Sequence, residues 1–110
     1  MLNEKDISIM MHDLDEALKD SADKQAVYEN LSDLKKTRLA AEENKVDGGS
    51  ESRRARIALD SEPYREFLKG LCAAREMFLG ARARCVYAQK RVDVWQTLMA
   101  NRREEIKKGL

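Results

Sequence analysis

The chain has 110 residues, of which 37% are charged and 5% aromatic, and its formal net charge is +1. This mixture, rich in alanine, leucine, glutamate, lysine and arginine, is typical of long helices and coiled coils. The length is that of one domain, so we expect a single domain over residues 1–110. No apolar stretch approaches the length of a membrane span, which predicts a soluble, cytoplasmic protein with no membrane partner.

The first half of the chain predicts one long helix, from about residue 4 to residue 44. Asn3 is a suitable N-terminal cap, with Asp6 three residues further on. Alternating steps of four and three then reach a mostly apolar set, Ile7, Met11, Leu14, Leu18, Ser21, Gln25 and Tyr28. This is the spacing of a helix packed along one side, although it is less regular than in the second half. From Leu31 this stripe changes phase, a slip that in coiled coils is called a stammer.

The segment NKVDGGS at residues 44–50 is the one clear break in the helical pattern, with paired glycines and a serine that can cap the next element. Residues 51–59 predict a short, arginine-rich helix. A second long helix is expected from about residue 62 to residue 108. Ser61 can cap it, and Pro63 falls in its first turn, where the missing N–H is harmless.

The second long helix carries an almost unbroken heptad pattern. Of thirteen positions reached by alternating steps of three and four, all but Arg102 are apolar: Tyr64, Phe67, Leu71, Ala74, Phe78, Ala81, Cys85, Ala88, Val92, Trp95, Met99 and Ile106. A repeat sustained over this length predicts a helix that packs along its whole length. We expect Trp95, the only tryptophan, to be packed on this seam and its indole N–H to need an acceptor. Small seam residues, with Gly70 and Gly80 nearby, indicate a close approach of another backbone.

Two long helices joined by a short connector predict an all-α fold: a long antiparallel helical hairpin, or coiled coil, with a short helix in the connector. A lone hairpin buries little apolar surface for a chain of this size. We therefore expect self-association into a dimer or tetramer, forming a helical bundle. The predicted interface is an apolar strip beside the seam, made of Cys72, Leu79, Val86 and Val94. The alternative is that the short helix at residues 51–59 covers part of this strip.

No pattern for catalysis, a metal or a cofactor is present in the sequence. His12 is the only histidine and lies next to Asp13 on a polar stretch, which predicts a solvated side chain. Cys72 and Cys85 would be separated by about 20 Å along one helix, beyond the reach of a disulfide. Long helices also lack the concave pocket that enzymes use. We expect a protein that is not an enzyme and binds neither a metal nor a cofactor.

Charge is unevenly distributed along the chain. Residues 1–50 carry a net charge of −5, and residues 51–110 carry +6. In one interpretation the two halves simply attract each other, and in the other the protein has a basic face for a polyanion. An antiparallel hairpin brings the acids of the first helix alongside residues 83–95, so we expect Arg84 and Arg91 to pair with them.

The arginines of the short helix, unlike Arg84 and Arg91, are not expected to pair with acids of the first helix. Arg53, Arg54 and Arg56 lie beside the turn, where few acids are expected nearby. The planar guanidinium group of arginine is well suited to a phosphate. These three residues are therefore the strongest candidates for contact with a nucleic acid.

Two segments resemble a pattern in small helical proteins encoded by tailed bacteriophages. In GGSESRRARIALDSEPYREFLKGL, glycine and serine precede an arginine-rich short helix and a Ser-acid-Tyr-Arg-Glu start of the next helix. In RARCVYAQKRVDVWQTLMANRR, an Arg-Ala-Arg segment leads into a hydrophobic-acid-x-Trp ending, with Gln96 where the pattern has arginine. The likeness covers about residues 47–103. Its pattern-bearing positions are Arg53, Arg56, Tyr64, Arg65, Trp95, Asn101 and Arg102.

The resemblance implies a link to phage genes for DNA replication and recombination. The expected function is thus a non-enzymatic accessory protein in the cytoplasm of the bacterial host, binding DNA or a DNA-bound protein. Its expected contact residues are Arg53, Arg54, Arg56, Asn101 and Arg103. Asn101 and Arg103 are included because they face away from the seam, so packing does not explain them. The alternative is a coiled-coil adaptor or inhibitor that acts by protein–protein contact only.

Overall fold

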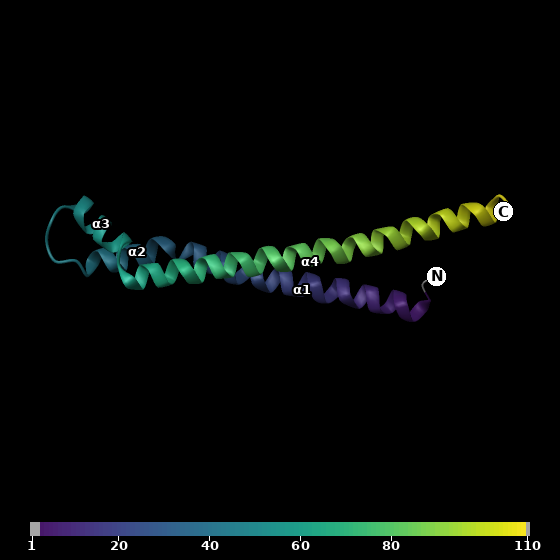
Figure 1. Ribbon diagram of the computed structural model, residues 1–110, viewed down its shortest axis with the longest axis horizontal. Coiled ribbons are helices and arrows are strands. Elements are labelled where there is room, and N and C mark those ends of the chain that lie inside the picture. The colour runs from purple at the N-terminus through teal and green to yellow at the C-terminus, as the bar shows by residue number, and fades with distance from the viewer. Residues whose placement is uncertain (1–2, 110) are drawn as a thin grey trace. The chain divides into compact units, whose positions relative to one another are not determined.

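The computed structural model describes residues 3–109, and the chain is helical throughout apart from its connections (Figure 1). The helices are α1 (Glu4–Asp33), α2 (Lys35–Asn44), α3 (Glu51–Leu59) and α4 (Glu62–Lys107). The predicted all-α helical hairpin with a short connector helix is confirmed. The chain divides into two compact units, Met1–Ala22 with Gly80–Leu110 and Asp23–Leu79, and α1 and α4 contribute to both. We call them the terminal unit and the connector unit.

Side chains cap the helices where the sequence predicts caps. Asn3 Oδ1 accepts a hydrogen bond from the amide of Asp6 at 2.9 Å, and Asp6 Oδ2 accepts one from the amide of Asn3 at 3.2 Å. This reciprocal pair satisfies amide groups that α1 itself leaves without partners. Ser50 Oγ caps α3 by accepting from the amide of Arg53 at 3.2 Å.

The prediction of one continuous helix over residues 4–44 is wrong in one detail, because the helix is divided at Leu34. The backbone hydrogen bonds nevertheless continue through this point. The amide of Leu34 donates to the carbonyl of Asn30 at 3.2 Å, and its carbonyl accepts from Arg38 at 2.9 Å. The interruption is therefore local, and it falls where the apolar stripe changes phase.

In the terminal unit, the first part of α1 runs antiparallel to the last part of α4 (Figure 1). The core between them is small, and half-buried Ala17 and Trp95 pack against it. Its buried members are Met10, Leu14, Ala88 and Val92. Trp95 is thus a packing residue, as predicted from its place on the heptad seam.

Two ion pairs fix the register of the terminal unit. Arg84 Nη2 lies 3.0 Å from Asp20 Oδ2, and Arg91 Nη1 lies 3.2 Å from Asp13 Oδ2. The predicted pairing of both arginines with acids of the first helix is confirmed. Because these pairs are partly exposed, each contributes at most about 1 kcal/mol. They show which residues of α1 and α4 lie level with each other.

This register corrects the predicted end of the apolar seam. Asp13 lies nine residues after the start of α1, so α4 is level with that start at about Ala100. Every residue of α4 beyond this point is exposed, and Ile106 is 66% exposed. The seam therefore ends at Met99, and its predicted members Arg102 and Ile106 lie past the start of α1.

In the connector unit, aromatic side chains fill the space between α4 and the helices before the turn. The rings of Tyr28 and Phe78 are stacked with centroids 6.0 Å apart. The Arg38 guanidinium lies 5.7 Å from the centroid of the Phe67 ring, a cation–π contact. Tyr64 is only 2% exposed. These contacts confirm Tyr64, Phe67 and Phe78 as packed members of the predicted seam.

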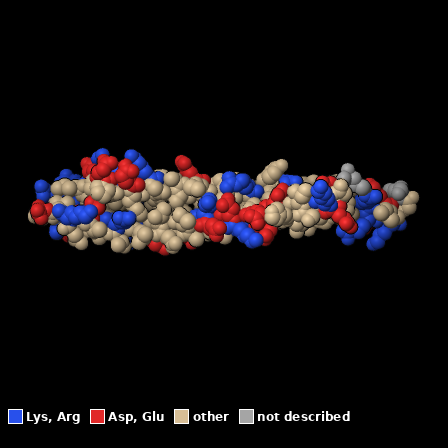
Figure 2. All heavy atoms as spheres, turned by 90° about the horizontal axis from the view of Figure 1, so that it is seen from below, with Lys and Arg blue, Asp and Glu red and all other residues tan. Residues whose placement is uncertain are grey.

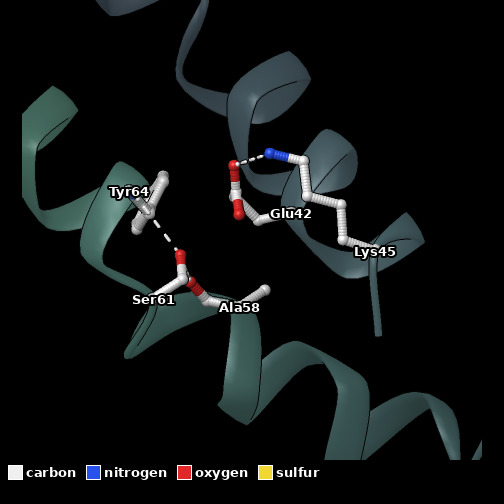
Figure 3. A network of polar contacts seen from close by, with 5 residues as sticks. All are labelled: Glu42, Lys45, Ala58, Ser61 and Tyr64. Carbon is white, nitrogen blue, oxygen red and sulfur yellow. Dashed lines mark hydrogen bonds and ion pairs between the residues drawn. The ribbon is translucent and has the colours of Figure 1, made fainter. Parts of the chain in front are cut away.

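A serine joins the end of α3 to the start of α4 (Figure 3). The Ser61 hydroxyl donates to the carbonyl of Ala58 at 2.7 Å and accepts from the amide of Tyr64 at 3.4 Å. Nearby, Lys45 Nζ lies 2.8 Å from Glu42 Oε1 at the end of α2 (Figure 3). The two hydrogen bonds of Ser61 hold the position at which α3 leads into α4, whereas the Lys45–Glu42 pair lies within the end of α2.

The expectation of close backbone packing at Gly70 and Gly80 is wrong within this chain. A Cβ atom added at Gly70 would have nothing within 4 Å, and one added at Gly80 would meet only Arg84 Nη1, at 3.8 Å. The paired glycines of the turn have a clearer role. Gly48 and Gly49 adopt φ angles of +69° and +86°, a region that side-chain-bearing residues rarely occupy.

Candidate functional site

The three arginines of α3 are not equivalent. Arg53 and Arg56 are exposed and line an open hollow together with Ile57, Asp60 and Ser61. Arg54 is half-buried on the side of the helix that carries Ala58, and Ala58 is only 1% exposed. The structure therefore brings Arg53 and Arg56 together at the surface, while Arg54 belongs partly to the packing face of α3.

Arg53 and Arg56 lack acidic partners. Within residues 3–109 neither forms an ion pair, and the acid beside them, Asp60, is engaged by Arg65 at 3.0 Å. The Arg53 side chain folds over the turn, since a Cβ atom at Gly49 would lie 2.8 Å from its Nη1. The hollow thus presents two guanidinium groups that form no ion pair with any residue that the structure describes, which favours contact with an external anion.

The other predicted nucleic-acid contacts lie elsewhere in the chain. Asn101 and Arg103 are exposed and follow Ala100, the residue of α4 that is level with the start of α1. Figure 1 shows this end of α4 continuing past the start of α1. They belong to the terminal unit, whereas Arg53 and Arg56 belong to the connector unit. The predicted contact residues are therefore divided between the two units.

Many other charges are paired along the helices or interspersed with opposite charge. Lys19 Nζ lies 2.9 Å from Asp15 Oδ2, and this hydrogen bond and attraction raise the pKa of Lys19. On the face drawn in Figure 2, basic and acidic side chains alternate without forming a continuous basic surface. Contact with a polyanion on this face would therefore depend on small clusters.

The predicted interface strip is exposed. Leu79, Val86 and Val94 are 46%, 49% and 59% exposed, and Cys72 is also exposed. The alternative, in which residues 51–59 cover the strip, is wrong for Cys72 and Leu79, which share the connector unit with α3. Helix α3 contacts α2 instead. The strip remains available for self-association.

Sequence reasoning missed an apolar hollow of about 370 Å³ in the terminal unit. It is lined by Met10, Tyr87, Lys90, Arg91, Val94, Trp95 and Leu98. The indole Nε1 of Trp95 is buried and has no hydrogen-bond partner among the described residues. The signal that could have revealed this site is Leu98, a large apolar residue that flanks the heptad seam three positions after Trp95.

No metal centre is found among the described residues. No three His, Cys, Asp or Glu side chains between residues 3 and 109 gather as metal ligands. Cys72 and Cys85 are both free thiols. None of the helices in this part of the chain is long and apolar enough to cross a membrane.

No protein-family model, curated protein or solved structure matches this chain. The resemblance to small phage proteins therefore rests on the two quoted segments alone.

Proposed function

We propose that the protein is a non-enzymatic accessory of phage DNA replication or recombination, acting in the cytoplasm of the bacterial host. It binds the phosphate backbone of DNA through Arg53 and Arg56. The observation that carries this proposal is the pair of exposed, unneutralised guanidinium groups at the α3 hollow. Asn101 and Arg103 provide a second, separate contact. Because phosphate contacts position a protein without reading bases, binding is expected to be independent of sequence.

A gel-shift experiment at two salt concentrations tests this function. The decisive variant is Arg53→Ala/Arg56→Ala, which leaves the half-buried Arg54 in place. Its affinity for single-stranded, duplex and branched DNA should fall for all sequences alike. The log–log salt dependence on duplex DNA should flatten by about 0.9 for each phosphate that the variant no longer neutralises.

A matched control separates a local contact from a general reduction of net charge. Arg75→Ala/Arg82→Ala also removes two exposed arginines, but these belong to α4 and do not line the α3 hollow. It should bind DNA nearly as the parent does. If both double variants lose the same amount of DNA affinity relative to the parent, the affinity depends on net charge alone and not on the α3 hollow. If the parent binds no DNA at low salt, the DNA-binding proposal is wrong.

The exposed apolar strip favours a second candidate function, an adaptor or inhibitor that acts by protein–protein contact and self-associates into a dimer or tetramer. Cys72, Leu79, Val86 and Val94 are exposed in the single chain, and such a strip loses unfavourable hydration when covered. Light scattering over a range of protein concentrations tests self-association directly. A protein that associates but binds no DNA would support this function over the first.

A further inference from the structure

The face of the terminal unit that holds the Trp95 hollow is incompletely covered in the single chain. Three of the apolar side chains around the hollow, Tyr87, Val94 and Leu98, are 67%, 59% and 56% exposed. They surround a preformed apolar space rather than standing singly on the surface. A cluster of this kind marks a contact surface more often than isolated exposed residues do.

The environment of Trp95 points the same way. Its indole N–H is buried without an acceptor among the described residues, which is uncommon in a complete protein interior. The core against which Trp95 packs is small, and α4 contributes only Ala88 and Val92 to its buried residues. A single chain therefore neither supplies an acceptor for the Trp95 N–H nor covers its surroundings completely.

The exposed area is large enough to supply a partner surface. The chain exposes 8471 Å² of surface, whereas a compact monomer of 12.6 kDa exposes about 6,200 Å². The excess is roughly 2,300 Å², and each partner of a standard interface contributes roughly 800 Å². This excess belongs to the whole chain, and the face around the hollow is one part of it.

The charges of the terminal unit fit a second copy of the same chain. Its α1 part, residues 4–22, carries six acidic and two basic side chains, and its α4 part, residues 80–107, carries seven basic and three acidic ones. Within the chain, Asp13 and Asp20 already pair with Arg91 and Arg84, so a second copy would meet the remaining charges and the outer sides of these pairs. A two-fold axis can place the acidic α1 of one copy against the basic α4 of the other, and the same contact then occurs twice. Lys90, at the rim of the hollow, is a basic residue that would face the acidic helix.

We propose that a second copy of this chain docks on this face, with Tyr87 and Leu98 of each copy covering the Trp95 hollow of the other. This inference rests on the self-association proposed above. It places the contact on the α1–α4 pair of the terminal unit and not at Cys72 and Leu79.

Two leucines of α4 form a matched pair of test positions, because both are about half exposed and only one borders the hollow. Leu98→Glu should weaken the dimer, measured by sedimentation equilibrium, by about 100-fold or more, since two symmetry-related charges lose water in one contact. Leu79→Glu, in the part of the predicted strip that belongs to the connector unit, should leave the dissociation constant within about threefold of the parent. Circular dichroism of both variants should show unchanged helix content, since neither leucine is buried.

The single tryptophan reports on the same contact. On dilution of the parent through its association range, Trp95 emission should move to longer wavelength as the hollow opens to water. In the Leu98→Glu variant, Trp95 should emit at the wavelength of the diluted parent at every protein concentration. Lys90→Glu provides a second variant at an exposed position and should shift the association in the same direction, by about tenfold.

The outcomes separate this inference from the function on which it rests. A parent that stays monomeric at high concentration overturns both the placement and the self-association. Disruption by Leu79→Glu, alone or as strongly as by Leu98→Glu, overturns the placement and leaves self-association standing. Disruption by Leu98→Glu and Lys90→Glu, with the Leu79→Glu variant intact, supports the placement.

Discussion

Replacing Gly70 by alanine tests whether Gly70 of α4 faces open space, as in the single chain, or a neighbouring backbone from a second copy. Gly70 lies inside α4 with an ordinary helical backbone, and an added Cβ atom would have nothing within 4 Å. Glycine in a helix interior costs up to about 1 kcal/mol relative to alanine, so Gly70→Ala should be stabilising by about that amount. With an unfolding entropy of about 2.1 cal/mol/K per residue, a chain of 110 residues should gain about 4 °C in Tm.

Thermal unfolding followed by circular dichroism, at one fixed protein concentration, measures this change. Gly48→Ala is the matched control of opposite sign. Its added Cβ atom would also meet nothing within 4 Å, but the backbone has φ +69°. A left-handed conformation costs a side-chain-bearing residue about 1–2 kcal/mol, so this variant should melt at a lower temperature than the parent.

A fall in Tm for Gly70→Ala would refute the reasoning. It would mean that the Cβ atom meets a neighbour that one chain does not supply, such as a backbone from a second copy. The expectation of close packing at Gly70, which the single chain contradicts, would then hold in the assembly. A rise in Tm with an unchanged state of association would confirm that Gly70 faces open space.

Three further predictions concern packing, capping and charge. Ser61→Ala removes the acceptor of the Tyr64 amide and should lower the free energy of unfolding, measured by urea titration, by about 1 kcal/mol. Trp95→Ala should cost less than about 3 kcal/mol in the same assay, because Trp95 is only half-buried and the void it leaves opens to solvent. The raised pKa of Lys19 means that its attraction to Asp15 persists at neutral pH and is lost as pH rises through that pKa. In an alkaline titration of stability, Lys19→Gln should therefore show a slightly flatter decline than the parent.

The helices and their ends could be predicted from sequence because the forces that set them are local. The heptad from Tyr64 to Met99 forms the packed side of α4, and the caps at Asn3, Ser50 and Ser61 all make their hydrogen bonds. Each of these features depends on residues three or four positions apart, which a helix always brings to one side. The pairing of the two long helices followed from the short connector between them.

Part of the predicted site was also accessible from sequence. Arg84 and Arg91 could be assigned to acids of α1 because an antiparallel pair leaves little freedom of register. Arg53 and Arg56 could be identified as unpaired because their expected neighbours near the turn are few. Arg54 could not be separated from them, since its burial depends on which side of α3 faces α2.

Only the tertiary structure decided where the packed surface ends and where an apolar hollow opens. The heptad alone continues to Ile106, yet α1 begins level with about Ala100 and leaves the last turns of α4 exposed. The hollow beside Trp95 likewise depends on how Met10 of α1 meets Val94 and Leu98 of α4. A sequence pattern shows which side of a helix is apolar. Burial of that side also requires contact with atoms of a distant segment. The length and register of the facing helix determine which residues make that contact.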